Sequence, residues 1–390
     1  MRVFFQLLQP FISMVTANNN ELRTTAQIQF SKQKTLDADV GYFSKTYIIK
    51  DHQLDGEFVA KEINANNFAN ADEYFEEARQ MYKARHPNIV PVRYAGHEPH
   101  EGDEDDAGLI YIVMPLMPNG SLASLAKKRQ LTVREIVTFG LQFLTGLAHT
   151  HRQGLVHFDV KPSNILLRKG NIAALTDFGL SKWQSSQGEA TTNIIYGTHA
   201  PPEYHNRSSQ TEVADIYQAG ITLYRLCNLP TTWSSQIPSA STPELAQTKL
   251  RDKITSGNFP DRKRFLPHIP NRLRTVVKKA TESDPNDRYQ SVREMMNELA
   301  SVEKYLDWKM ERQGSDTDDE AWEWRNPEHR NHIGRTCRLE ICGNGDEYSV
   351  KGSKKVTGDF RSNNVNSRGN LDSKEAAFKH VKRRIRRNEW

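Results

Sequence analysis

The sequence has few cysteines and no long apolar run. Three cysteines, an odd number, do not suit a disulfide framework and are typical of a reducing compartment. The N-terminal stretch MRVFFQLLQPFISMV faintly resembles an export signal, but polar residues and Pro10 interrupt it and no small-residue cleavage site follows. It is also too short to span a bilayer. We therefore expect a cytoplasmic, soluble chain without a transmembrane segment; a docking segment or a true start at Met14 would explain the stretch.

Neither sign of charge dominates: the net charge is +5 over 390 residues, which is too small to indicate a partner. The distribution is more informative. Residues 311–328 hold 7 acidic and 2 basic side chains, whereas residues 331–390 hold 14 basic and 7 acidic ones. At 37% hydrophobic and 26% charged residues the composition is that of an ordinary globular protein, long enough for two or three domains.

Hydrophobic periodicity predicts an α+β fold of two lobes. Residues 26–63 alternate in short runs that predict antiparallel strands, and a helix and two further strands follow before residue 116. After Asn119-Gly120 the pattern becomes helical, broken by short strands and one long polar loop. We expect an N-terminal extension at 1–25, a β-rich lobe at 26–116 and a helical lobe at 117–308.

The composition changes near residue 310. Residues 309–330 are acidic and contain GSDTDDE, which predicts a linker. Residues 331–390 then predict a small basic β-β-α module, with strands at TCRLEI and EYSV and a helix that begins at Asp372-Ser373.

Side chains suited to phosphoryl transfer lie in the helical lobe. In HFDVKPSN, Asp159 would accept the proton of a hydroxyl and Lys161 would neutralise the transferring phosphate. Asn164 and, in DFG, Asp177 would bind Mg²⁺, which prefers a few hard oxygen ligands together with phosphate.

Two residues of the β-rich lobe complete this set. Lys61, in FVAK, would end a strand and bind the α- and β-phosphates of a nucleotide. Glu77, near the middle of the following helix, would hold Lys61 by an ion pair.

Each motif alone is weak, but they occur in an ordered series. FVAK, Glu77, HPNIV, HFDVKPSN, DFG, PPE, DIYQAG and DPNDRY together resemble the eukaryotic-like (Hanks-type) serine/threonine protein kinase family over about residues 30–308. The resemblance implies a bilobal protein-kinase-like fold, ATP with Mg²⁺ (or Mn²⁺) as cofactors, and protein substrates. Lys161 in Asp-x-Lys-Pro-x-x-Asn, with Thr198, resembles the serine/threonine class.

The resemblance also assigns roles to further residues. The nucleotide site it implies consists of Gly41, Val59, Lys61, Met114, Pro115, Leu116, Met117, Leu166 and Asp177. The hydrophobic spine of the active state would be Met81, Val92, His157 and Phe178. Asp215 would anchor the catalytic loop, and Glu203 with Arg288 would form a buried ion pair.

The loop expected to cover the phosphates keeps only one glycine, Gly41. Asp39, Gly41 and Ser44 stand where three glycines would let the backbone approach them. A pseudokinase scaffold is therefore an alternative to an active enzyme. A small-molecule kinase of the aminoglycoside or choline type is another, although PPE, DIYQAG and DPNDR are not expected together in that class.

Phe158 replaces the arginine that, in many kinases, precedes the base aspartate and binds a phosphorylated activation loop. A neutral phenyl ring would pack instead of pairing with a phosphate. We expect autophosphorylation in the polar loop, but not as a switch acting through residue 158; expression, a partner or the tail would provide control. The candidate acceptors are Ser185, Ser186, Thr191 and Thr192.

The C-terminal helix carries 7 basic residues between Lys374 and Arg387. Such a helix could bind nucleic acid or an anionic membrane, bind the acidic segment 311–328, or present a solvated face. A zinc site drawn from His329, His332, Cys337 and Cys342 matches no common ligand spacing.

Overall fold

The computed structural model of the chain forms two compact units, which we describe separately. The residues that the structure describes are 28–36, 44–68, 73, 75–99, 107–185, 187–190, 197–205, 209–304, 307–313, 321–326, 336–343, 347–355, 360–364 and 366–387. The expected N-terminal extension, Asp39, Gly41, Ser186, Thr191 and Thr192 lie outside these residues.

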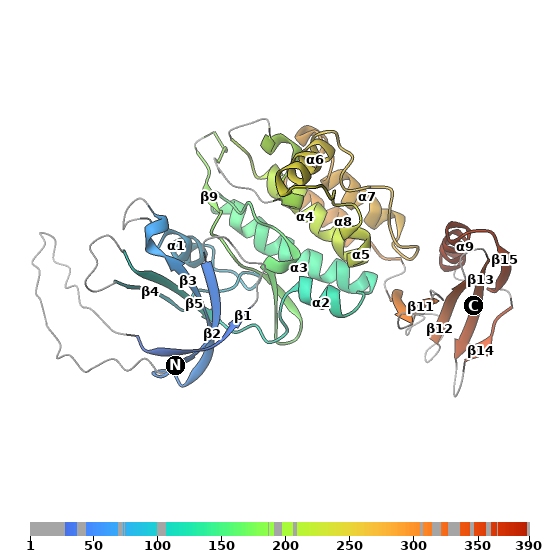
Figure 1. Cartoon of the computed structure of the whole chain (residues 1–390), viewed down its shortest axis with the longest axis horizontal. Coiled ribbons are helices and arrows are strands. Elements are labelled where there is room, and N and C mark those ends of the chain that lie inside the picture. The colour runs from blue at the N-terminus through green and yellow to red at the C-terminus, as the bar shows by residue number, and fades with distance from the viewer. Residues whose placement is uncertain are drawn as a thin grey trace, which may run out of the picture. The chain divides into compact units, whose positions relative to one another are not determined.

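The first unit, residues 1–82 and 91–116, is built on a five-stranded antiparallel sheet in the order β1-β2-β3-β5-β4 (Figure 1). Ala60 belongs to a buried cluster with Ile49 and Val113, so the next side chain along β3 points to the opposite face. The elements are β1 (Phe30–Leu36), β2 (Ser44–Asp51), β3 (Gly56–Asn64), the 3₁₀ turn η1 (Ala65–Asn67), α1 (Glu76–Lys83), β4 (Tyr94–Glu98) and β5 (Leu109–Pro115).

The second unit, residues 83–90 and 117–390, begins with a helical part. Helix α3 starts at a capping box in which Thr132 and Glu135 satisfy each other's backbone N–H groups, and α4 is buried along nearly its whole length. The helices are α2 (Leu122–Lys128), α3 (Val133–Arg152), α4 (Val213–Leu226), α5 (Pro230–Ser234), α6 (Pro243–Thr255), α7 (Asn271–Ala280) and α8 (Val292–Ala300).

Two short antiparallel pairs hold the loops between α3 and α4. They are β6 (Leu155–Val156) with β9 (Lys182–Trp183), and β7 (Ile165–Arg168) with β8 (Ile172–Leu175). The 3₁₀ turns are η3 (Pro162–Asn164), η4 (Gly197–His199), η5 (Pro202–His205) and η6 (Pro285–Asp287). The α+β class and the order of a β-rich part followed by a helical part are confirmed.

The C-terminal region differs from the expected linker and β-β-α module. Two strands fall inside the expected linker and pair with each other, and the second of them pairs with β12, so the sheet has six strands. The acidic composition of this region led to the prediction of a linker, although Trp322 and Trp324 alternate with polar residues as in a strand. The elements are β10 (Lys309–Gln313), β11 (Ala321–Asn326), β12 (Thr336–Gly343), β13 (Tyr348–Lys355), β14 (Arg361–Ser362), β15 (Arg368–Leu371) and α9 (Lys374–Arg387).

This module has a hydrophobic core of its own. Helix α9 packs on β12, β13 and β15, and its Phe378 ring meets Trp324 edge-on at 5.5 Å between centroids (Figure 1). The buried side chains of the sheet include Trp324, Leu339 and Ile341, and those of the helix Val381 and Ile385. The helix is thus amphipathic, as predicted. In the described part of the chain no helix is both long enough and apolar enough to cross a membrane.

A buried ion pair supports the helical part. Arg288 forms two hydrogen bonds with the Glu203 carboxylate, at 2.7 and 2.6 Å, and the Arg288 side chain is 0% exposed. The predicted pairing of these two residues is therefore present. The Arg288 guanidinium also donates to the backbone carbonyls of Glu282 and Ser283. Because the pair is buried, removal of either Arg288 or Glu203 would leave the other charge without its ionic partner.

We predict that Arg288→Ala lowers the free energy of unfolding by about 3–5 kcal/mol, because Glu203 keeps a buried charge without a partner. The control is Arg262→Ala, which removes the more exposed pair with Glu282 and should cost about 0–1 kcal/mol. Urea unfolding followed by circular dichroism measures both. Equal losses of unfolding free energy in the two variants would contradict the assignment of Arg288 and Glu203 as the ion pair that supports the helical part.

Candidate active site

Lys61 and Glu77 form an ion pair in the first unit. The Lys61 ammonium lies 2.8 and 2.9 Å from the two carboxylate oxygens of Glu77, and both side chains are about nine-tenths buried. Lys61 is on the central strand β3, where it pairs in register with Thr46 and Ile112. The pair predicted from spacing is therefore formed, and it fixes the direction of the lysine ammonium.

The loop between β6 and β7 brings three of the predicted polar residues into contact. The Lys161 ammonium lies 2.9 Å from Oδ2 of Asp159. The Asn164 amide nitrogen donates to the same oxygen at 2.8 Å and to the Asp159 backbone carbonyl at 3.0 Å. Asp159 is thus held from two sides, with an ammonium against its carboxylate.

The buried carboxylate of Asp215 fixes this loop. It accepts hydrogen bonds from the backbone N–H groups of His157 at 2.8 Å and Phe158 at 2.7 Å, and its Oδ2 lies 2.7 Å from His151 Nε2. Asp215 itself is 0% exposed. The anchoring role that the family resemblance gave to Asp215 agrees with these contacts.

Sequence reasoning missed two further residues of α4 that hold the loop. Gln218 accepts from the Val160 N–H and donates to the Phe158 carbonyl, both at 2.8 Å, and Thr222 donates to the Val160 carbonyl at 3.1 Å. These residues follow Asp215 by three and seven positions, so they share its face of the helix. A polar stripe in an otherwise apolar helix was the signal.

Burial of Asp159 raises the pKa of its carboxyl; the nearby Asp177 carboxylate raises it further, and Lys161 opposes both. A buried carboxylate with a raised pKa is a better proton acceptor than an exposed one. His157 accepts the Asp159 N–H at its Nδ1, 3.2 Å away, and burial lowers the pKa of its imidazole, so the ring is neutral and protonated on Nε2. Its ring packs on Phe178 at 4.7 Å between centroids.

Asn164 and Asp177 have the chemistry of a Mg²⁺ site. Because the Asn164 amide nitrogen is committed to Asp159, its amide oxygen is the atom left for a cation. Asp177 directly precedes Phe178 and has a left-handed backbone, with φ 65°. One amide oxygen and one carboxylate suit a cation that keeps waters and phosphate oxygens. The residues fit the ion that the sequence predicts.

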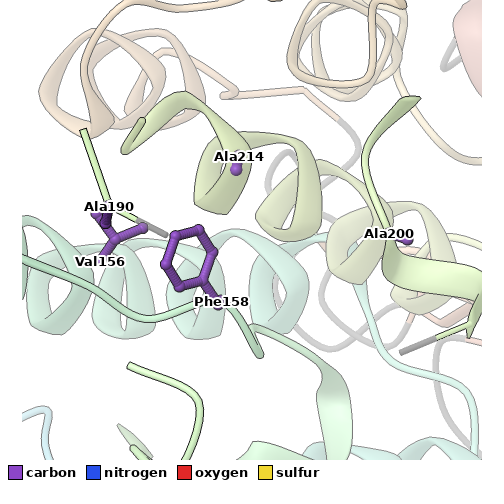
Figure 2. Packing of buried hydrophobic residues seen from close by; sticks show 5 residues of the cluster. All are labelled: Val156, Phe158, Ala190, Ala200 and Ala214. Carbon is purple, nitrogen blue, oxygen red and sulfur yellow. The ribbon is translucent and has the colours of Figure 1, made fainter. Parts of the chain in front are cut away.

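Phe158 is fully buried with φ 63°, a conformation rare for a bulky residue. Figure 2 shows its ring beside Val156 and Ala190; Ala200 and Ala214 belong to the same buried cluster, on which Leu180 and Tyr204 pack. Ala190 lies in the polar loop, and its backbone exchanges two hydrogen bonds with Gln210, at 2.8 and 2.9 Å. The phenyl ring therefore packs, as predicted, and part of its packing partner is the loop itself.

The remaining residues expected around a nucleotide are distributed over both units. Val59, Met114 and Pro115 lie on β3 and β5 of the first unit, with Leu116 directly after β5, and Met117 and Leu166 belong to the second. Gly41 lies outside the described residues. The Thr198 hydroxyl is 3.3 Å from His199 Nδ1.

The zinc alternative gains no support. Cys337 and Cys342 lie on β12, five positions apart, so their side chains point to opposite faces of the strand. His329 and His332 fall outside the described residues. Among those that are described, no three histidine, cysteine or carboxylate side chains group as metal ligands.

Comparison with known proteins shows the family of the chain. Residues 39–299 match the family model of the protein kinase domain. The serine/threonine-protein kinase PrkC of Bacillus subtilis is 31% identical over 270 residues, covering 67% of this chain and 39% of that protein. PknK of Mycobacterium tuberculosis is 30% identical, covering 68% and 23%, and mouse Nek1 is 28% identical, covering 68% and 21%. The chain therefore spans less than half of these relatives.

We predict that Asp215→Asn destabilises the protein by about 2–4 kcal/mol, because an amide NH₂ would face backbone donors and leave them unpaired. Asp284→Asn is the matched control: this exposed residue caps η6, and asparagine caps as well as aspartate. Thermal and urea unfolding measure the difference. A cost no larger than that of the control would mean that the Asp215 carboxylate does not hold the loop.

Proposed function

The chain belongs to the protein kinase family, and from that premise we propose that it transfers the γ-phosphoryl group of Mg-ATP to serine or threonine hydroxyls of proteins. The contact of Asp159 with Lys161 and Asn164, on a loop anchored by Asp215, is the observation that carries the proposal. A carboxylate, an ammonium and an amide in mutual contact match the needs of this reaction, which depends on positioning and charge stabilisation.

In this proposal each side chain has one task. Asp159 orients the substrate hydroxyl and receives its proton, which its raised pKa favours. Lys161 places positive charge beside the oxygens of the group in transfer, and Lys61, fixed by Glu77, orients the nucleotide phosphates. Asn164 and Asp177 would hold Mg²⁺, which when bound neutralises phosphate charge.

The phosphate-covering loop, which lacks two of its three expected glycines, favours a scaffold without activity. The geometry of the site favours an enzyme. A protein retained only for binding has no need for Asp159 to be buried against Lys161 and Asn164. Those side chains supply the charge stabilisation, whereas the glycine loop positions phosphates. We therefore propose weak nucleotide affinity as the consequence of Asp39 and Ser44, with catalysis retained.

We also propose that the polar loop at residues 182–196, called the activation segment below, does not depend on a phosphate paired with residue 158. Phe158 is buried in one cluster with Ala190 of this segment, and the Ser209 hydroxyl donates to the Glu189 carboxylate at 2.8 Å. An arginine in the place of Phe158 would need a negative partner; a phenyl ring is satisfied by apolar neighbours. Autophosphorylation of this segment would then be a by-product of activity.

We predict that Asp159→Ala abolishes transfer of label from γ-³²P-ATP to protein in the presence of Mg²⁺, with a loss of about 10²–10⁴-fold or more, because the hydroxyl has no proton acceptor. Asp284→Asn serves as a folded, active control. Thermal unfolding checks that Asp159→Ala is folded. Equal labelling of the wild type and Asp159→Ala would reject the enzyme and leave the scaffold.

Alanine at Ser185, Ser186, Thr191 and Thr192 together should leave the initial rate within about twofold of the wild type, because Phe158 offers no charge for a phosphate. Initial rates with a protein substrate, measured on wild type and variant that have both first been incubated with Mg-ATP, provide the comparison. If the variant lost most of its activity while keeping its thermal stability, control through a phosphorylated segment would replace this proposal.

A further inference from the structure

Two helices of the second unit have an excess of positive charge. Helix α7 has four basic residues and no acidic one, and α9 has seven basic residues and one acidic one, Glu375. The basic residues of α7 are Arg272, Arg274, Lys278 and Lys279. Those of α9 are Lys374, Lys379, Lys382, Arg383, Arg384, Arg386 and Arg387.

These two helices meet at the start of α7. The Arg386 guanidinium donates to the Asn271 side-chain oxygen at 2.7 Å. Lys382 precedes Arg386 by four residues and so shares its face of α9. Burial lowers the pKa of the Lys382 ammonium, and Arg274, Arg386 and Lys278 lower it further. Four cations from two helices therefore converge on one place.

The partners of these cations are neutral. Arg274 donates to the backbone carbonyls of Ile269 at 2.8 Å and Leu266 at 2.9 Å. Burial, followed by the charge of Arg386, lowers the pKa of the Arg274 guanidinium to about 10, so it remains charged at neutral pH.

Within the described ranges no carboxylate lies at ion-pair distance from Arg274, Lys278, Lys382 or Arg386. Two carboxylates line a surface hollow of about 430 Å³ that also includes Lys278: Glu282, which is bound to Arg262 at 2.6 Å, and Asp287, which is not at ion-pair distance from Lys278.

An unneutralised cluster of this kind attracts an anionic partner, since the mutual repulsion of the cations is relieved when carboxylates or phosphates bind. Neither helix offers an exposed aromatic ring for stacking nucleic-acid bases: α7 has none, and Phe378 of α9 is packed on Trp324. The absence of a stacking ring favours a peptide over a single-stranded nucleic acid.

We propose that the α7–α9 surface, defined as Arg274, Lys278, Lys382 and Arg386, binds an acidic segment of the protein substrate. The choice of a substrate rests on the proposed kinase function. Helix α7 packs against α4, whose Asp215 holds the catalytic loop, so the surface belongs to the same unit as the catalytic residues. A segment bound there would raise the effective concentration of the acceptor hydroxyl near Asp159.

The test measures binding without ATP, so its result is independent of catalysis. Fluorescence anisotropy follows a labelled glutamate-rich peptide, a matched glutamine-rich peptide and a labelled single-stranded oligonucleotide of equal charge, each titrated with the full chain. The variants are Lys382→Glu/Arg386→Glu and, on the exposed surface of α7, Lys278→Glu. Lys127→Glu/Lys128→Glu on α2 is the control with the same change in charge as the double variant.

We expect the wild type to bind the glutamate-rich peptide in a salt-sensitive way and not the glutamine-rich one. Lys382→Glu/Arg386→Glu should weaken that binding by about tenfold or more, and Lys278→Glu in the same direction, whereas the control stays near wild type. Lack of binding by the acidic peptide, or an equal loss in the control, would overturn the proposal. So would binding of the oligonucleotide alone through this surface, which would make the partner a nucleic acid.

Discussion

The buried carboxylate of Asp215 is the constraint on which the catalytic loop depends. Its two oxygens hold the backbone at His157 and Phe158, directly before Asp159. The left-handed backbone of Phe158 costs about 1–3 kcal/mol and persists only where its surroundings enforce it. Asp215 and Gln218 supply that enforcement from one helix face. The positions of Asp159, Lys161 and Asn164 thus follow from a rigid, buried helix rather than from the loop's own preference.

Phe158 connects this loop to the core of the helical part. A charged residue at this position would leave the order of the activation segment dependent on a modification. We propose that packing of the phenyl ring takes the place of such a modification; burial of apolar surface, unlike an ion pair, is not screened by salt. The backbone bridge between Ala190 and Gln210 acts in the same direction, since it fixes the segment by hydrogen bonds that carry no net charge.

Sequence patterns brought out the polar side chains of the candidate site, because phosphoryl transfer requires particular side chains at particular spacings. Lys61 and Glu77 form the ion pair that the spacing indicated, whereas the contacts of Asp159 with Lys161 and Asn164 are known only from the structure. Gln218 and Thr222 were missed because they act on backbone atoms, which any loop sequence presents. The strands β10 and β11 were missed because acidic side chains between and around them gave the region the composition of a linker.

The hairpin of β10 and β11 makes the region 309–330 a part of the C-terminal module instead of a linker to it. Trp324 contributes its ring to the core beneath α9, and β11 covers the free edge of β12. A chain cut at residue 331, where composition suggests a boundary, would lose this ring and expose a row of unpaired backbone groups along β12. An uncovered edge of that kind recruits strands from other molecules, so such a fragment would aggregate instead of folding as an independent domain.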